Sequence, residues 1–294
     1  MLNYSIIGVV EYEVKRLKYK KSFYFMLAIA LLPFVTVAIV KYFNLEARGI
    51  FPVEESTHLW LYLYGTPRNI GSGTMLSATG IAAYMWLFAS LFGGDSIASD
   101  IEDNGIQLIL AKPLTRIEYL AGKTLSLLGV FTTVYFLGAL SSLISAYIMV
   151  GPQAYVYLVV ILPLVTAVSS IPITLLSAWI GGYTRSSLTG LLSGIGLYFL
   201  SSTIAGLVGF TGGDRFFERI FDYSLLDPIR ASTQISTATV MYLTGLHKIV
   251  FPRIGGVHPT YDVNKLFIGS WLNLVVSSVV ILFLMVKWFS RKSF

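Results

Sequence analysis

The sequence predicts an all-α integral membrane protein with six transmembrane helices and an amphipathic interfacial helix at its N-terminus. Of the 294 residues, 55% are hydrophobic and only 12% are charged, and the mean hydropathy is +0.73. Soluble domains carry about 25% charged residues, so lipid must surround most of this chain. We therefore expect a single transmembrane domain over residues 1–294.

The predicted spans are apolar segments of about 20 residues, the length that crosses the hydrocarbon core of a bilayer. No span holds Asp, Glu, Lys or Arg at its middle, which argues against a proton- or sodium-coupled carrier. The six spans cover approximately residues 23–40, 75–94, 119–150, 156–180, 188–210 and 266–289.

The first 21 residues precede these spans. Apolar residues from Ile6 to Leu17 recur near helical spacing, and Lys15 and Arg16 occupy other positions. This pattern predicts an amphipathic helix on the inner membrane surface, with its cations near anionic lipid headgroups. The alternative is a positively charged flank that only sets the topology.

The distribution of Lys and Arg orients the predicted bundle. More of the 21 Lys and Arg residues fall on short inner segments than on the longer outer loops when both termini are cytosolic. We therefore expect a multi-pass protein of the cell membrane with cytosolic N- and C-termini. Residues 41–73 and 211–265 then form water-exposed outer loops, and Trp60, Tyr62 and Tyr64 form an interfacial aromatic belt.

A charged stretch at residues 95–118 separates the second and third spans. Ser99 with Glu102 three residues later reads as a capping box that begins a helix, and Pro113 ends that helix. Thr115 with Glu118 reads as a second capping box, which begins the next helix. The stretch is thus predicted to be a rigid cytosolic helix-turn-helix at the end of two spans.

This stretch and the residues after it contain an acidic residue, a nearby glycine, two leucines, Pro-Leu-Thr-Arg and a later Gly-Lys, namely Glu102, Gly105, Leu108, Leu110, Pro113, Leu114, Thr115, Arg116 and Lys123. This order resembles the pattern of type-two ABC exporter permeases. The six spans and the long last outer loop resemble the multi-copper and gliding-associated branch of that family. The resemblance implies that residues 95–118 are a coupling helix for ABC ATPase subunits, with Arg185 as a second contact. The coupling residues would be Glu102, Gly105, Leu108, Lys112, Pro113, Leu114, Thr115 and Arg116.

The resemblance also implies that two permease copies or paralogues form the pore, and that ATP and magnesium bind to the separate ATPases. In this chain Gly122-Lys123-Thr124 resembles the tail of a P-loop, but Ile117 stands where the first glycine should be. We expect no cofactor on this chain and no catalytic residues. The net charge of +6 does not imply nucleic-acid binding.

Metal-ligand patterns are weak in this sequence. It contains no cysteine, and its three histidines, His58, His247 and His258, have no ligand spacing. We therefore predict no metal site.

Gly190 and Gly194 place small residues on one face of the fifth span. Such faces let helices approach closely in lipid. The pair therefore predicts either a dimer contact or a packing face inside one bundle.

The function predicted from the sequence is that of an ABC permease subunit which exports or extracts an amphiphilic substrate. One alternative is a mechanotransmission subunit, in which ATP drives motion and residues 211–265 grip an extracytoplasmic protein. Another is a membrane scaffold or channel unrelated to ABC transporters.

Overall fold

The computed structural model describes residues 6–42, 57–65, 80–102, 115–210, 227–245 and 262–291, and every regular element in these ranges is a helix. The predicted all-α class is therefore confirmed for the described ranges. The elements are α1 (Ile6–Lys18), α2 (Lys21–Ala30), α3 (Leu32–Tyr42), α4 (Leu59–Tyr64), the 3₁₀ helix η2 (Ile81–Tyr84), α6 (Met85–Glu102), α8 (Arg116–Val150), α9 (Leu158–Ser169), α10 (Ile171–Thr184), α11 (Ser187–Phe210), α13 (Pro228–Thr244) and α15 (Val263–Arg291).

Five helical segments are long and apolar enough to cross a membrane, namely η2–α6, α8, α9–α10, α11 and α15. The predicted first span is instead a pair of helices, α2 and α3, bent by 42°. Pro33 is the second residue of α3, where its missing N–H is tolerated but a continuous helix is not favoured. If this bent pair crosses as one unit, the number of spans is six.

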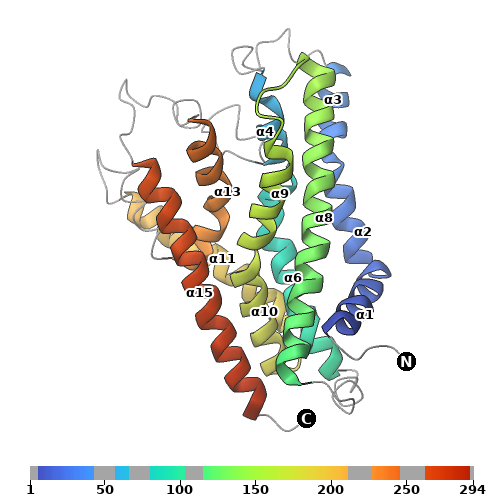
Figure 1. Cartoon of the computed structure of the whole chain (residues 1–294), viewed down its shortest axis with the longest axis vertical. Coiled ribbons are helices and arrows are strands. Elements are labelled where there is room, and N and C mark those ends of the chain that lie inside the picture. Colours follow the sequence, from blue (N-terminus) through green and yellow to red (C-terminus); the bar gives the residue numbers. More distant parts are fainter. Residues whose placement is uncertain are drawn as a thin grey trace.

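The first helix, α1, and the end of the last helix, α15, lie at one end of the bundle, which we call the terminal end (Figure 1). There Glu102, the last residue of α6, accepts a hydrogen bond from the Ser187 N–H of α11 at 2.8 Å. At the same end the Arg116 guanidinium donates to the Phe289 carbonyl of α15. The opposite end, which carries the turn between α8 and α9, we call the distal end. The sequence analysis predicted that the two chain ends and residues 95–118 lie on the same side of the membrane.

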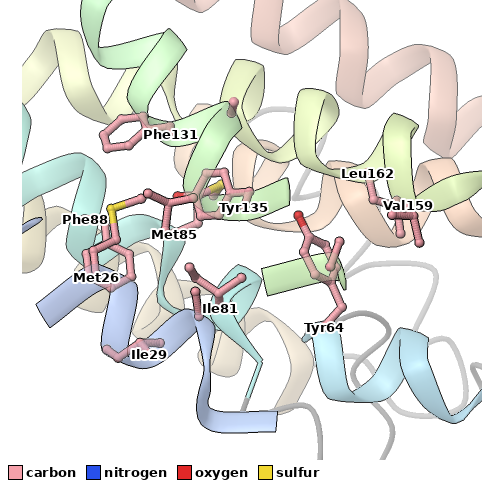
Figure 2. Packing of buried hydrophobic residues seen from close by; sticks show 14 of the residues in the cluster. Met26, Ile29, Tyr64, Ile81, Met85, Phe88, Phe131, Tyr135, Val159 and Leu162 are labelled. Atoms are coloured by element: carbon pink, nitrogen blue, oxygen red, sulfur yellow. The ribbon is translucent and has the colours of Figure 1, made fainter. Parts of the chain in front are cut away.

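The helix α4 lies in the predicted outer loop 41–73, yet it is part of the core. Trp60 and Tyr64 are both 0% exposed, and the Trp60 indole N–H donates to the Ala154 carbonyl at 2.8 Å. Figure 2 shows Tyr64 beside Ile81 in this core. The aromatic-belt prediction is therefore wrong for Trp60 and Tyr64, because this short apolar helix packs against α8 and the α8–α9 turn.

The helix α13 lies in the predicted outer loop 211–265, and it is also buried. Ala231, Ile235 and Ala238 are 0% exposed, and α13 packs against α9 and α15. Figure 1 shows it beside α15. The prediction of a water-exposed segment is wrong for this helix. Burial is possible because several of its hydroxyls bond within the helix, as Thr239 does to the Ile235 carbonyl.

Asp227 fixes where α13 begins. Its carboxylate accepts hydrogen bonds from the Ile229 N–H and from the hydroxyl of Ser201, a residue well inside α11. At the other end of α13, the Tyr155 hydroxyl of the α8–α9 turn donates to the Thr244 carbonyl. The helix thus begins beside the interior of a span and runs to the distal end.

Glycines allow α6, α10 and α11 to pack backbone to backbone. A Cβ on Gly94 would lie 2.5 Å from the Leu191 nitrogen, and one on Gly190 would lie 2.6 Å from the Gly94 Cα. A Cβ on Gly194 would lie 2.3 Å from the Ser177 hydroxyl. Gly190 and Gly194 therefore form a packing face inside this chain.

Candidate functional site

Four charged side chains from three helices meet at the terminal end, and we call them the ionic ring: Glu13 and Arg16 of α1, Asp100 of α6 and Lys123 of α8. The Lys123 amine lies 2.7 Å from a carboxylate oxygen of Glu13 and 2.7 Å from one of Asp100. Arg16 contacts the other oxygen of Glu13 at 2.7 Å and the other oxygen of Asp100. Each cation thus bridges both carboxylates, and the formal charges cancel.

The ionic ring is buried. The side chains of Glu13, Lys123 and Asp100 are 0%, 3% and 5% exposed, and that of Arg16 is 18% exposed. Taking each of these charges out of water costs several kcal/mol unless partners and hydrogen bonds compensate. Tyr119 supplies one such bond, since its hydroxyl donates to Asp100 at 2.5 Å. Removal of one member would leave a buried charge without its partner, which is strongly unfavourable.

The sequence around Lys123 allows α1 to approach α8. A Cβ on Gly122 would lie 2.7 Å from the Cβ of Val9, so only glycine fits at this crossing. Glu13 and Arg16 are three residues apart and therefore share one face of α1, which is the face toward α8. The Gly-Lys pair that resembles a P-loop fragment thus serves helix packing and charge pairing.

The location of the ionic ring corrects one sequence-based prediction. A helix covers Ile6–Lys18, but its charged residues Glu13 and Arg16 face the bundle while Ile7 and Tyr12 are exposed. The charges within the spanning helices lie near helix ends, with Asp100 close to the end of α6 and Lys123 close to the start of α8. The available signal was the pair Glu13–Arg16 on α1, together with an acid near the end of one span and a lysine near the start of the next.

A further ion pair lies beside the ionic ring. Lys20, just before α2, contacts the carboxylate of Asp95 in α6. Burial lowers the pKa of Lys20 to about 8, and the nearby Arg16 charge acts in the same direction. This pair ties the start of the bent pair α2–α3 to α6.

The base of α8 is also joined to α15. The Arg116 guanidinium donates to the Phe289 carbonyl and lies 5.8 Å from the centroid of the Phe289 ring. The Tyr119 ring stacks on the same phenyl ring, with an interplanar angle of 7°. Arg116, Tyr119 and Lys123 are spaced i, i+3 and i+7, so they share one side of the helix. We call them the basal face of α8.

The predicted capping box at the start of α8 is present. The Thr115 hydroxyl accepts from the Glu118 N–H at 3.2 Å, and the Glu118 carboxylate accepts from the Thr115 N–H at 2.7 Å. The capping box predicted at Ser99 is wrong. Ser99 lies inside α6, where its hydroxyl donates to the Asp95 carbonyl at 2.6 Å.

The remaining predicted coupling residues fall into two groups. Glu102 and Arg185 both lie at the terminal end, since Glu102 binds Ser187 and Arg185 ends α10 in a left-handed conformation with φ of 57°. The others lie in residues 103–114, outside the described ranges, and they are Gly105, Leu108, Lys112, Pro113 and Leu114.

Acidic and histidine side chains do not gather elsewhere in a way that suggests a metal site. Over the described ranges, no group of three or more His, Cys, Asp or Glu side chains could hold a metal ion.

In the described ranges the chain is an all-helical membrane protein, and ion pairs at the terminal end join α1 to the spanning helices α6 and α8. The sequence model of the family described as ABC-2 family transporter protein matches residues 7–290, and the chain belongs to this family. Its members are membrane permease subunits of ABC transporters, generally without catalytic activity, and they work with ABC ATPase subunits. No curated protein and no solved structure matches the chain significantly.

Proposed function

We propose that this permease subunit couples ATP hydrolysis on separate ATPase subunits to the export or extraction of an amphiphilic substrate, and that the ATPases bind residues 103–114 from the cytosol. The observation that carries this proposal is the ionic ring. It joins α1 to the ends of α6 and α8, the two helices between which residues 103–114 lie.

The ionic ring makes these helix ends move as one unit. Separating Lys123 from Glu13 or Asp100 would leave a buried charge without its partner, which costs about 3–5 kcal/mol. Force applied to residues 103–114 therefore moves α6, α8 and α1 together. Through Arg116 and Tyr119 the same displacement reaches the end of α15. The terminal end thus has the properties of a lever.

The composition of the spanning helices supports an amphiphilic substrate. From Thr124 to Thr184, which includes most of α8 and all of α9 and α10, the sequence contains no Asp, Glu, Lys or Arg. Ser and Thr hydroxyls are the main polar groups there, including Ser142, Thr166 and Ser170. Such helices offer apolar contact and hydrogen bonds, but no fixed charge for an ionic substrate.

The outer faces of α11 and α15 support pairing with a second permease copy or a paralogue. Leu192 and Leu207 of α11 and Leu272 and Phe283 of α15 are more than half exposed in the single chain. Lipid or another permease must cover these faces in the membrane.

The proposal is tested by reconstituting the chain with its ATPase in vesicles and measuring ATP turnover and amphiphile release together. We expect the amphiphile to stimulate ATP turnover, and Lys123→Met to abolish that stimulation while the exposed Lys15→Met preserves it. Equal stimulation in both variants would contradict the claim that the ionic ring makes α1, α6 and α8 move together. Stimulated ATP turnover without any release would contradict export and favour a mechanotransmission subunit.

A further inference from the structure

The hydroxyl of Thr166, in α9, joins the two buried helices of the distal end. The Tyr64 hydroxyl of α4 donates to it at 2.9 Å, and the Ser236 hydroxyl of α13 lies 3.1 Å from it. Tyr64, Thr166 and Ser236 are 0%, 1% and 5% exposed. The helices α4 and α13, which are far apart in the sequence, therefore both bond to the hydroxyl oxygen of Thr166.

The hydrogen-bonding capacity of this atom is fully used. The Thr166 hydroxyl donates its only hydrogen to the Leu162 carbonyl at 2.8 Å. Its two acceptor positions then receive Tyr64 and Ser236, which must both act as donors. Loss of the Thr166 oxygen would leave two buried hydroxyls without this partner, a state that proteins avoid.

The chain has a weak point on each side of Thr166. Pro163, inside α9, lacks an N–H, so the Val159 carbonyl loses its usual helical donor. On the other side, α9 ends at Ser169 and α10 begins at Ile171, with Pro172 in its first turn. Near the second weak point, the Ser169 hydroxyl lies 2.9 Å from the Met85 sulfur of α6. Ser169, the last residue of α9, is thus tied to α6, and the rest of α9, with Thr166, can tilt about this point.

The distal ends of α4 and α13 both contact the turn that leads into α9. The Ala154 N–H donates to the Thr57 carbonyl at 2.8 Å just before α4, and Tyr155 donates to Thr244 at the end of α13. Movement of this turn with α9 therefore acts on both helices at once.

We propose that Thr166 is the positioning residue of a gate at the distal end of the bundle, formed by α4 and α13. The Thr166 hydroxyl keeps α4 and α13 closed against α9, and tilting of α9 about the break between α9 and α10 releases both. Only the claim that ATP drives this opening rests on the proposed function, because the closed joint is a property of the chain itself.

The absence of cysteine from the chain allows a direct test. Single probes are introduced by Leu61→Cys in α4 and Ala238→Cys in α13, both of them fully buried positions. Ala139→Cys in α8 is the buried control, and Tyr157→Cys, at a residue 52% exposed, is the accessible control. The rate of labelling by a membrane-impermeant maleimide is measured on the chain in lipid vesicles.

Thr166→Val keeps the shape of the side chain and removes the hydroxyl. We expect it to speed labelling at positions 61 and 238 by about tenfold, which corresponds to the loss of one to two buried hydrogen bonds, while Thr166→Ser leaves the rates near those of the parent. Unchanged rates in Thr166→Val would overturn the proposal. Equal acceleration at position 139 would also overturn it, because it would indicate general loosening.

Two further variants separate the arms of the gate. Tyr64→Phe is expected to speed labelling at position 61 and Ser236→Ala at position 238, each with little effect on the other probe. If each variant accelerated both probes equally, Thr166 would not be the joint.

The last arm of the test adds the ATPase and ATP to the parent chain, and we expect faster labelling at positions 61 and 238. If Thr166→Val opens the gate but ATP does not, the gate stands and the coupling function fails. If ATP speeds labelling while Thr166→Val does not, the coupling function stands and the proposal for Thr166 fails.

Discussion

Lys123 is the residue on which the terminal end depends most, because its amine contacts the carboxylates of both Glu13 and Asp100. A buried ion pair contributes little net stability compared with well-packed apolar residues, but removal of one partner is severe. The ionic ring therefore contributes little to the free energy of folding, but breaking it is strongly unfavourable. For this reason α1, α6 and α8 are difficult to separate.

Lys123→Met should destabilise the protein by about 3–5 kcal/mol, since it leaves an excess of buried negative charge between Glu13 and Asp100. The measurement is the thermal unfolding temperature in mild detergent, followed by tryptophan fluorescence. Lys15→Met is the matched control, because the Lys15 side chain is 69% exposed and pairs with Glu11 along the helix surface. Equal unfolding temperatures for the two variants would show that the ionic ring is not formed.

Tyr119→Phe removes only the hydroxyl that donates to Asp100 and keeps the ring that stacks on Phe289. A hydrogen bond to a charged group contributes about 1.5–3 kcal/mol, so the unfolding temperature should fall by less than in Lys123→Met. Combining the two substitutions tests whether they share one network. A loss equal to the sum of the single losses would indicate independent sites.

At this scale the sequence predicted one capping box correctly and the other wrongly, for a physical reason. Thr115 follows a proline-containing connection, so its hydroxyl meets free N–H groups at a helix start. Ser99 has the same spacing to Glu102, but the helix that precedes it continues, and its hydroxyl turns back to the Asp95 carbonyl. Spacing alone cannot distinguish a helix start from a helix interior.

Among the elements, α8 is the one that connects the most parts of the terminal end. Its first two turns carry the basal face, and its capping box stands where residues 103–114 end. A capped first turn resists unfolding, so a force on the preceding segment displaces α8 as a rigid helix.

Thr115→Ala should weaken this start by about 1 kcal/mol, whereas Thr115→Ser should preserve the cap. The measurement is hydrogen exchange of the amides at residues 116–118, which should become faster only in the alanine variant. Equal exchange rates of these amides in the alanine and serine variants would show that the cap does not stabilise the start of α8.

The contact of α6, α10 and α11 depends on glycine. Gly94→Ala would place a methyl group 2.5 Å from the Leu191 backbone nitrogen, so the helices would have to separate. We expect a clearly lower unfolding temperature and altered ATP-dependent coupling. Gly196→Ala, in α11, meets nothing within 4 Å and should leave the unfolding temperature unchanged or slightly higher. Similar losses in both variants would contradict the packing described here.

For the whole molecule, hydropathy was enough to predict the class and the main apolar segments, because spanning helices are set by bilayer thickness. Hydropathy missed the burial of α4 and α13, since one is too short and the other too rich in hydroxyls to resemble a span. It also missed the ionic ring, which exists only once α1 folds against α6 and α8. Tertiary packing, rather than local pattern, decides all three.

The relative placement of the chain ends supports the assembly proposed for this permease. The terminal end contains α1, the end of α15, residues 102 and 115 and the turn between α10 and α11 (Figure 1). A partner bound there would contact the helix ends that the ionic ring joins, while the proposed gate lies at the opposite end. Coupling between the two ends therefore has to travel along the helices that cross between them.

The most direct test of the central claim is purification of the tagged chain from its native membrane in mild detergent, with mass spectrometry of the proteins bound to it. We predict that an ATPase with Walker motifs copurifies with the parent and with Lys15→Met, and is lost from a Lys112→Glu, Leu114→Asp double variant that still unfolds at the parent temperature. Absence of an ATPase from the parent, or its retention by the double variant, would contradict the account of this chain as a permease driven through residues 103–114.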